Sequence, residues 1–548
     1  MMRRTDKNMW QFREARDVRP YDKFVLAVLT SAGIVSIIHL MEWWFQRKHI
    51  VNFPLFVILS TFFWYGIFRI ILIWINYLGI KKPPPPPKPR EGLRVAIFTT
   101  SAPGEPVSMF EKTLAALRNV RYPHTTYLLD STQDPAFKAV AEKHGAVFLD
   151  LANLPGAKAG KVNKALEMTD EEFILILDPD HIAFPNFLDE TLGFFEDERV
   201  GFVQVSQGYY NQYRSFTAAG AAEQTYTFYG PTQMGLYGYG AAVAIGANCL
   251  FRRTALESIG GHAVSLAEDL VTSMRLHAAG WHSVYHPVII NRGLVPEDFG
   301  SFAKQQLKWA RGVFEVLFVE YPKLFRKFTF WQKLSYGAIA FYYFTGLMTL
   351  FFILIPPFYF LTGVLPANMS FAEFLIKGAP IAIVSLAVYL YVQKFLVHPA
   401  TERGFHWRGM ILKYAMWPIY FLAFVLSIFN RKIPYIPTAK TADTGKLTPF
   451  VRPLIWYNLF FIFTVLLVFI NRKYYVPESE LLFSSSRTWG MVAFSVLAFV
   501  QSTGGILAAM EALRLKEELP WEQVDVNHIE TEKENILRFR ENEKPEFG

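Results

Sequence analysis

Long apolar stretches at both ends of the chain require much of it to lie in a membrane. The stretch Phe53–Leu78 is apolar almost throughout, and about 20 helical residues are enough to cross the hydrocarbon core of a bilayer. Phe24–Leu40 precedes it as a second such stretch. The other candidates lie in the C-terminal half, at residues 334–361, 381–396, 456–470 and 492–509. The sequence therefore predicts a polytopic membrane protein with two helices before a soluble block and four after it.

Basic residues beside these stretches predict the orientation of the protein. They precede the first stretch from Arg3 onward, and Lys81 and Lys82 follow the second. Because cytoplasmic segments carry the excess of Lys and Arg, we expect both chain ends and the central block in the cytoplasm. This makes the chain a multi-pass protein of the inner membrane. The same bias explains the net charge of +8, so nucleic acid is not expected as a partner.

One more apolar stretch, Met410–Phe429, has basic residues on both sides. Both of its ends therefore resemble cytoplasmic ends, which disfavours a single crossing. We expect an interfacial helix at about 404–430, bent near Pro418, and a loop at 431–450 after it. A seventh transmembrane span is the alternative. The highly charged tail, residues 511–548, is expected to be partly disordered.

The central block alternates between strand-like and helix-like stretches. Residues 83–90, which include Pro83–Pro87, form a stiff linker into a domain at 91–300. The expected strands are 95–100, 125–130, 146–150 and 173–178, and the expected helices are 106–119, 135–144, 161–168 and 184–196. This alternation is typical of an α/β fold with a mostly parallel sheet. Amphipathic helices at 301–333 are expected to join the domain to the next membrane span.

Two aspartates stand directly after the most apolar of these strands. Phe173–Leu177 is uninterrupted and then meets Asp178-Pro179-Asp180-His181. An unbroken apolar run suits a strand that is buried on both faces, and open α/β sheets bind ligands at the carboxyl ends of their strands. Two carboxylates one residue apart can share a divalent cation, which in turn binds the oxygens of a diphosphate. Taken alone, this triplet is common in ordinary loops.

Further motifs follow in a fixed order. They are YLLDSTQD (127–134), KAGKVNKAL (158–166), LDPDH (177–181), AEDL (267–270), GLVPED (293–298), QQLKWARG (305–312) and PYIPTAK (434–440). In this order they resemble the motifs of processive family 2 glycosyltransferases, in particular of bacterial cellulose synthase catalytic subunits, over residues 50–510. The resemblance implies an α/β domain of the GT-A type that is inserted between transmembrane helices.

The resemblance also implies which side chains bind the donor. The positions that match nucleotide-sugar contacts are Asp130, Lys158, Asp178, Asp180, Gln305, Lys308, Thr438 and Lys440. Asp178 and Asp180 are also expected to hold Mg²⁺ or Mn²⁺. Lys308 stands where the family has arginine, so it offers phosphate a point charge instead of a bidentate fork. Arg311, three positions on, is a candidate to compensate.

The same resemblance assigns the catalytic role to the AEDL motif. Asp269 matches the general base of an inverting transfer, which takes the proton of the acceptor hydroxyl, and Glu268 is its neighbour. Trp309 is expected to stack on the acceptor sugar, with anchoring at the membrane interface as the alternative. Cys249, the single cysteine of the chain, is expected to pack beside the acceptor. One cysteine also excludes an internal disulfide framework.

The motif PYIPTAK matches a gating-type loop of the family. Tyr435, Thr438 and Lys440 stand at its aromatic, threonine and lysine positions, and Pro437 replaces a valine. A loop of this kind covers bound nucleotide, excludes water and then opens. A solvated basic loop is the alternative.

By resemblance, then, the chain is a membrane-embedded, processive, inverting glycosyltransferase. It is expected to polymerise a UDP-sugar, with UDP-glucose as the first candidate, into a β-linked polysaccharide that passes through its own helices, and a periplasmic export partner is a candidate recipient. Synthases of curdlan, chitin or hyaluronan type are alternatives, as is a non-processive lipid glycosyltransferase. A transporter or scaffold with a degenerate domain is disfavoured because the DPD and AEDL carboxylates are complete. No cyclic-di-GMP-binding domain is expected in the tail.

Overall fold

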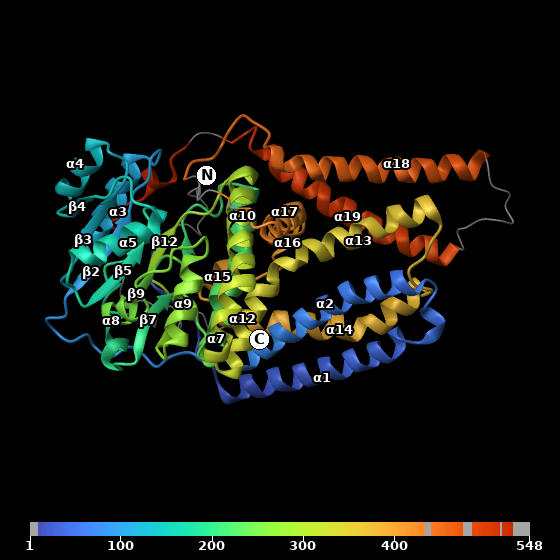
Figure 1. The fold of residues 1–548 in the computed structure, drawn as a ribbon, viewed down its shortest axis with the longest axis horizontal. Coiled ribbons are helices and arrows are strands. Elements are labelled where there is room, and N and C mark those ends of the chain that lie inside the picture. Colours follow the sequence, from blue (N-terminus) through green and yellow to red (C-terminus); the bar gives the residue numbers. More distant parts are fainter. Residues whose placement is uncertain (1–8, 432, 434–439, 475–484, 516–517, 530–548) are drawn as a thin grey trace, which may run out of the picture.

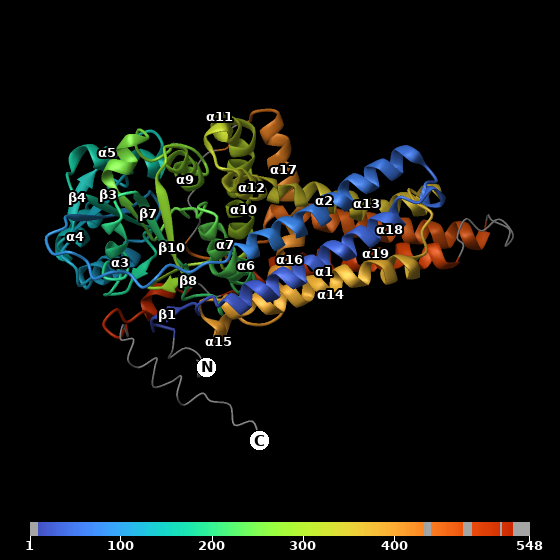
Figure 2. The ribbon, with the colours of Figure 1, turned by 90° about the horizontal axis from the view of Figure 1, so that it is seen from below.

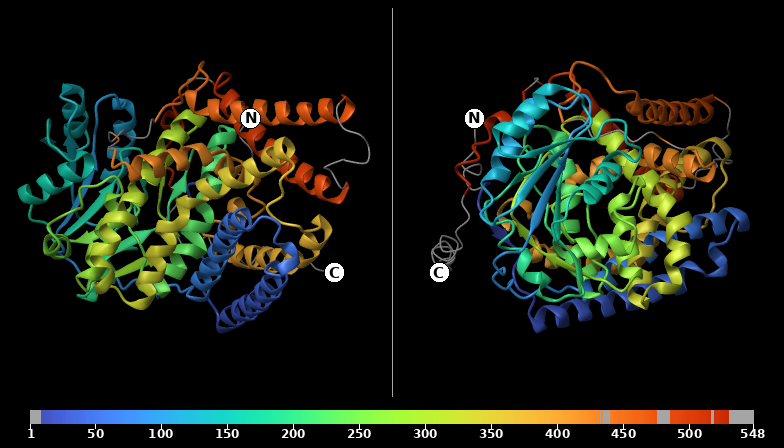
Figure 3. Two further views of the ribbon diagram at one scale, coloured as in Figure 1. Left: turned by 45° about the vertical axis from the view of Figure 1, so that its right-hand side comes forward. Right: turned by 60° about the vertical axis from the view of Figure 1, so that its left-hand side comes forward.

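The computed structural model describes residues 9–431, 433, 440–474, 485–515 and 518–529. It consists of an α/β domain, on the left of Figure 1, and a bundle of long apolar helices to its right. Helices from both ends of the sequence, blue and orange to red, lie on the same side of the α/β domain (Figures 2 and 3). The expected insertion of one domain between two sets of apolar helices is confirmed.

A mixed sheet forms the centre of the α/β domain. Within the described residues its order is β10-β7-β9-β5-β2-β3-β4. The strands are β2 (Val95–Thr100), β3 (Thr125–Asp130), β4 (Val147–Asp150), β5 (Phe173–Leu177), β7 (Val200–Val205), β9 (Cys249–Arg252) and β10 (His282–His286). β2 and β5 are buried along their whole length, which is why their sequences do not alternate between apolar and polar residues.

The sheet is mostly parallel, as predicted, with one exception. β2 pairs in parallel with both β3 and β5, whereas β9 runs antiparallel to β5 and β7. Through this pairing Cys249 lies opposite Ile176 near the carboxyl end of β5. The antiparallel strand β9 therefore brings the residues before it, which include Gly246, to the edge of the sheet where ligands are expected.

The flanking helices agree with prediction except for one. α3 (Val107–Arg118), α4 (Pro135–Lys143) and α5 (Ala157–Met168) confirm three expected helices. The helix expected at 184–196 is wrong, since only Leu192–Glu196 is helical, as a short 3₁₀ turn. At Gly193 an added side chain would collide with the backbone oxygen of Pro87. At the start of the stretch, backbone groups bond to distant segments: Phe184 N donates to the oxygen of Ile290 at 2.9 Å, and Arg121 N donates to the oxygen of Pro185 at 2.8 Å.

A smaller sheet continues from the DPDH turn. It contains β6 (Ile182–Ala183), β12 (Asn291–Gly293) and β8 (Gly208–Tyr209) in the order β6-β12-β8. β6 pairs antiparallel with β12. The turn between β5 and β6 is therefore held by the large sheet on one side and by the small sheet on the other.

Both ends of the described chain pack on the α/β domain. β1 (Arg13–Glu14) pairs with β11 (Val288–Ile289). Trp521 is fully buried, and its Nε1 donates a hydrogen bond to Ser108 Oγ at 3.0 Å. Residues 518–529 of the tail therefore pack on the domain, because burial of Trp521 and its apolar neighbours is favourable. Residues 530–548 lie outside the described residues.

Six helices in the part of the chain that the structure describes are long and apolar enough to cross a membrane. They are Pro20–Trp44 (α1), Phe53–Leu78 (α2), Phe330–Thr362 (ending in α13, Thr345–Thr362), Phe371–Phe395 (mostly α14, Phe371–Val392), Pro449–Leu467 (in α18, Arg452–Tyr474) and Met491–Glu511 (in α19, Ser485–Glu511). They coincide with the six predicted stretches. α16 (Trp407–Ala415) and α17 (Trp417–Ile428) meet at 43°, so the bend near Pro418 is confirmed, and the interfacial position of this pair remains a prediction.

Candidate active site

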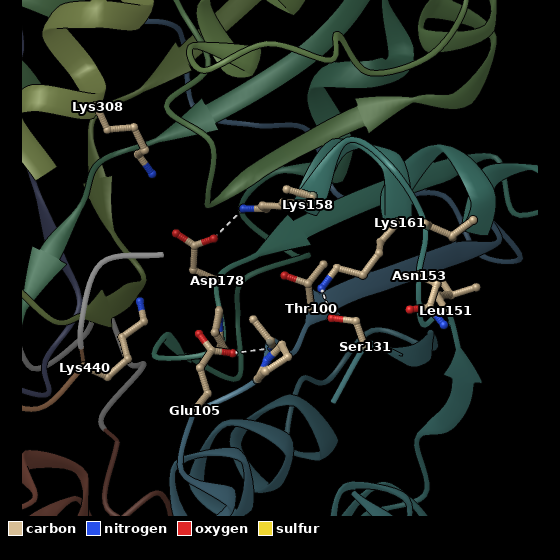
Figure 4. A pocket seen from close by; sticks show the side chains of 15 residues that line it. Thr100, Glu105, Ser131, Leu151, Asn153, Lys158, Lys161, Asp178, Lys308 and Lys440 are labelled. Carbon is tan, nitrogen blue, oxygen red and sulfur yellow. Dashed lines mark hydrogen bonds and ion pairs between the residues drawn. The ribbon is translucent and has the colours of Figure 1, made fainter. Parts of the chain in front are cut away.

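A cavity of about 300 Å³ opens where β2, β3 and β5 end. The described residues that line it include four lysines and two carboxylates (Figure 4), namely Lys158, Lys161, Lys308, Lys440, Glu105 and Asp178. The carboxyl ends of parallel strands are the expected place for a ligand in such a sheet. The excess of cations favours a ligand with several negative charges, such as a diphosphate.

Asp178 lies at the centre of this group. It accepts a hydrogen bond from Lys158 Nζ, which also donates to the backbone oxygen of Gly246. Burial alone would raise the pKa of Asp178, but Lys158 and His181 lower it below its ordinary value. The first turn of α5, which begins after Gly156 in a left-handed conformation, places Lys158 for this contact. Asp178 is therefore an ionised carboxylate with a fixed cationic partner.

Asp180 is almost fully buried below Asp178. Its Oδ2 accepts a hydrogen bond from the Leu294 amide at 2.9 Å, and its Oδ1 accepts one from Lys440 Nζ at 2.7 Å. His181 Nδ1 lies 3.5 Å from the same Oδ1. Burial would raise the pKa of Asp180, but these two cationic neighbours lower it. Lys440, far along the sequence, is thereby brought to the DPDH turn, and its role in nucleotide binding stays a prediction.

The DPDH turn has the donor set for a hard divalent cation. One ligand atom each from Asp178, Asp180 and His181 lie within 4.8 Å of one another. Among the described residues His181 Nδ1 has no hydrogen-bond partner, while its Nε2 faces Gln207 Oε1 at 2.9 Å, which orients the ring. Carboxylate oxygens suit Mg²⁺ and Mn²⁺. These residues therefore fit such a metal.

The second pair of carboxylates forms the first turn of α9 (Glu268–Ala278). A side chain added at Gly246, whose φ is +81°, would come within 3.3 Å of Asp269 Oδ2, so glycine permits the close approach. Burial, followed by repulsion from Asp269, raises the pKa of Glu268 to about 7, and burial raises that of Asp269. Because Gly246 also binds Lys158, one backbone segment joins this pair to the DPDH turn.

α10 (Phe299–Glu315) carries the QQLKWARG motif along the side of the site. Lys308 lines the cavity and is electrostatically coupled to Glu268 and Asp178. Gln305 precedes it by one helical turn, and Trp309 is 37% exposed. The ring of Trp309 is thus accessible next to Lys308, and its stacking on the acceptor sugar stays a prediction.

Arg311 does not compensate for the lysine at position 308, so that expectation is wrong. Its side chain is buried and donates to Glu315 Oε2 at 3.1 Å and to the backbone oxygen of Arg431 at 3.2 Å. The pairing along α10 turns the guanidinium away from the residues that line the cavity. Phosphate recognition on this side is left to lysine.

Asp130 organises a turn under the cavity instead of lining it. Its carboxylate is fully buried and accepts hydrogen bonds from the hydroxyls of Ser101 and Thr132 and from the amides of Thr132 and Gln133. These bonds hold Ser131 in the cavity wall. The family role of Asp130 in binding the nucleoside stays a prediction.

Cys249 is buried at the start of β9, and burial raises the pKa of its thiol well above the ordinary range, which leaves it inert. Its expected place near the acceptor is consistent with its proximity to Asp269, whose charge acts on it. Tyr435, Pro437 and Thr438 of the gating-type loop lie outside the described residues.

Two residues of the site were missed in the sequence. Lys161 Nζ donates to Ser131 Oγ at 3.0 Å, and burial lowers the pKa of Lys161 to about 8. Glu105 accepts a hydrogen bond from the Ala102 amide at 2.8 Å, and burial raises the pKa of Glu105 to about 7. Lys161 could have been predicted, because it lies three residues after Lys158 and so on the same face of one helix. Glu105 lies in a loop after β2 and carried no comparable pattern.

Comparison with known proteins agrees with this geometry. Residues 173–433 match the family model described as glycosyl transferase family group 2. The chain is 32% identical over 271 residues to the cellulose synthase catalytic subunit (UDP-forming) of Komagataeibacter sucrofermentans, covering 48% of this chain and 34% of that protein. It is 26% identical over 361 residues to the corresponding subunit of Pseudomonas fluorescens, covering 62% and 48%. The matches thus span from about a fifth to a half of the curated relatives' length.

Among solved structures, the chain is similar to a mannosyltransferase of Pyrobaculum calidifontis in complex with GDP-mannose and Mn²⁺. The sequence identity is 18% and the TM-score is 0.46, with 69% of this chain and 99% of that one covered. The family match contains the DPDH turn, the AEDL pair and the QQLKWARG helix. Residues 173–433 therefore match glycosyl transferase family group 2, and the chain is similar to bacterial cellulose synthase catalytic subunits.

Proposed function

We propose that the chain is a membrane-embedded, processive, inverting glycosyltransferase. Its donor is a UDP-sugar, with UDP-glucose as the first candidate, and its product is a β-linked polysaccharide that the helix bundle carries across the inner membrane. The catalytic domain faces the cytoplasm. The observation that carries this proposal is the junction at Gly246, where the cation-rich DPDH cavity meets a second carboxylate pair whose pKa values are raised.

The lysines around Asp178 supply the charge that a diphosphate needs. Lys158, Lys308 and Lys440 surround the carboxylate in Figure 4 and come from three separate parts of the chain. Asp178, Asp180 and His181 would hold Mg²⁺ or Mn²⁺, which when bound stabilises the negative charge of the leaving diphosphate. Since Lys158 and Lys440 neutralise these carboxylates in the structure, both contacts rearrange when donor and metal bind.

Asp269 performs the acid–base step. The acceptor hydroxyl oxygen forms a bond to the anomeric carbon of the donor, its proton passes to Asp269, and the bond from that carbon to the diphosphate breaks so that UDP leaves. Attack from the face opposite the leaving group inverts the configuration. Two adjacent buried carboxylates do not readily ionise together. Because the pKa of Glu268 rises to about 7, Asp269 remains the better candidate for the ionised base near neutral pH.

Synthesis by the full-length protein in nanodiscs tests the proposal. UDP-glucose, UDP-GlcNAc, UDP-glucuronate and GDP-mannose are supplied separately in radiolabelled form, with Mg²⁺, with Mn²⁺ or with EDTA. We expect a high-molecular-weight product that requires metal and a UDP-sugar, and that glycan-specific hydrolases degrade. A short, lipid-extractable product would instead establish a non-processive transferase. Absence of turnover with every donor would support a degenerate domain.

A further inference from the structure

Three tyrosines connect the catalytic domain to the helix bundle. Tyr342 and Tyr343 have ring centroids 4.9 Å apart, and Tyr343 and Tyr420 have centroids 5.0 Å apart. Tyr420 OH donates a hydrogen bond to Gln306 Oε1 on α10 at 2.9 Å. The charge of Asp269 acts on Tyr343. This tyrosine cluster therefore links α10, which carries the QQLKWARG motif, to α17 of the apolar helices.

Two cations from different helices face the ring of Tyr342. The guanidinium of Arg69 on α2 lies 4.7 Å from its centroid, and Lys413 Nζ on α16 lies 5.3 Å from it. Both helices belong to the apolar part of the protein. Arg69, Tyr342 and Lys413 are each half-buried, so the two cations and the ring between them keep accessible surface.

Neither cation is neutralised by a carboxylate of the described residues. Arg69 also contacts Tyr65, and one of its terminal nitrogens is buried without a hydrogen-bond partner in the described part of the chain. The ionisable groups that act on Lys413 are Tyr414 and Arg69, and the latter repels it. Like charges placed together in an apolar surrounding are costly. Such a pair is expected where a passing anion supplies the missing charge.

We propose that Arg69 and Lys413 form a binding site for carboxylate groups of the product, so that the polymer carries uronosyl units. The inference rests on the proposed function and specifies its substrate class. A uronosyl unit would come from a UDP-uronate by the same step: the acceptor oxygen bonds to the anomeric carbon, the proton goes to Asp269 and UDP leaves. Tyr342 supplies a flat face for the sugar ring, and the two cations pair with its carboxylate.

Binding of matched oligosaccharides tests the site without requiring turnover. The full-length protein in neutral phosphatidylcholine nanodiscs is titrated with fluorescent cellotetraose and with the β-1,4-linked tetraglucuronate of the same length. We expect the carboxylated probe to bind about tenfold more tightly, or more, with a preference that declines as salt is added. The double variant Arg69→Gln/Lys413→Gln should lose the preference, and Arg69→Lys should retain most of it.

Lys333→Gln is the matched control, because Lys333 also lies over a ring, that of Phe325 at 4.8 Å, but apart from the tyrosine cluster. It should retain the preference. Equal binding of the two probes by the native protein, or a preference that survives in the double variant with an unchanged unfolding temperature, would overturn the proposal. So would a preference that phosphatidylglycerol in the nanodisc abolishes, since the cations would then bind lipid phosphate. Probe preference without turnover from any donor would refute only the proposed function.

Discussion

Replacement of Lys158 by methionine removes the cation that joins the DPDH turn to the Gly246 segment. Lys158 Nζ donates to both Asp178 and the oxygen of Gly246, and methionine fills a similar volume without charge. In the proposed function Lys158 turns from Asp178 to the diphosphate of the donor when the donor binds. A hydrogen bond to a charged group contributes about 1.5–3 kcal/mol, and the Lys158 side chain is only 9% exposed. We therefore expect a cost of about 2–3 kcal/mol at the transition state.

Since 1.36 kcal/mol corresponds to a factor of ten, kcat/KM should fall by about 30- to 150-fold. The assay is the initial rate of incorporation from whichever radiolabelled donor supports synthesis. Lys164→Met is the matched control, because Lys164 lies on the same helix, is 45% exposed and pairs only with Glu167 at the surface. Its rate should stay within about twofold of the native rate. A Lys158→Met enzyme with a native rate and a native unfolding temperature would refute the role of Lys158.

Three other predictions address the metal, the carboxylate pair and the tail. Asp180→Asn should abolish the response of synthesis to Mg²⁺ and Mn²⁺, measured by metal titration; a native titration curve would remove Asp180 from the metal site. Because the pKa of Glu268 is raised to about 7 by burial, its stabilising protonation is lost as pH rises through 7. Glu268→Gln should therefore gain thermal stability relative to the native protein between pH 5 and pH 8.5, and a pH-independent difference would contradict this. Trp521→Ala should lower the unfolding temperature, with a cost of about 3–5 kcal/mol, whereas Trp309→Ala should not, since Trp309 is partly exposed.

Much of this architecture could be predicted from the sequence, because periodicity and apolar length report local physics. β5 is continuously apolar since it is buried on both faces, and the spanning helices are apolar over the thickness of a bilayer. The expectation of a helix at 184–196 was wrong because the backbone at its start bonds to residues far away in sequence, with Phe184 N donating to Ile290 O and Arg121 N donating to Pro185 O. No local pattern contains those contacts.

The candidate site shows the same limit. The DPDH turn was found because its residues are neighbours in sequence and follow an apolar strand, whereas the AEDL pair was assigned from the family resemblance. The resemblance assigned Lys440 to the nucleotide but did not predict its contact with Asp180, and Glu105 was missed because the fold alone brings it to the cavity. Arg311 was misassigned because Glu315 and the backbone of Arg431 hold it elsewhere. The burial of Trp521 was not predicted, because the tail was interpreted from its high overall charge and not from its single tryptophan.

The most direct test of the central claim separates donor binding from chemistry at Asp269. Native protein and the Asp269→Asn variant are compared in nanodiscs for donor binding by calorimetry and for polymer synthesis, both with the UDP-sugar that supports synthesis by the native protein. We predict that both bind this donor with similar affinity, and that the variant loses synthesis by about 10²- to 10⁴-fold, as expected for removal of a general base. Polymer synthesis at the native rate by the Asp269→Asn variant would contradict the account.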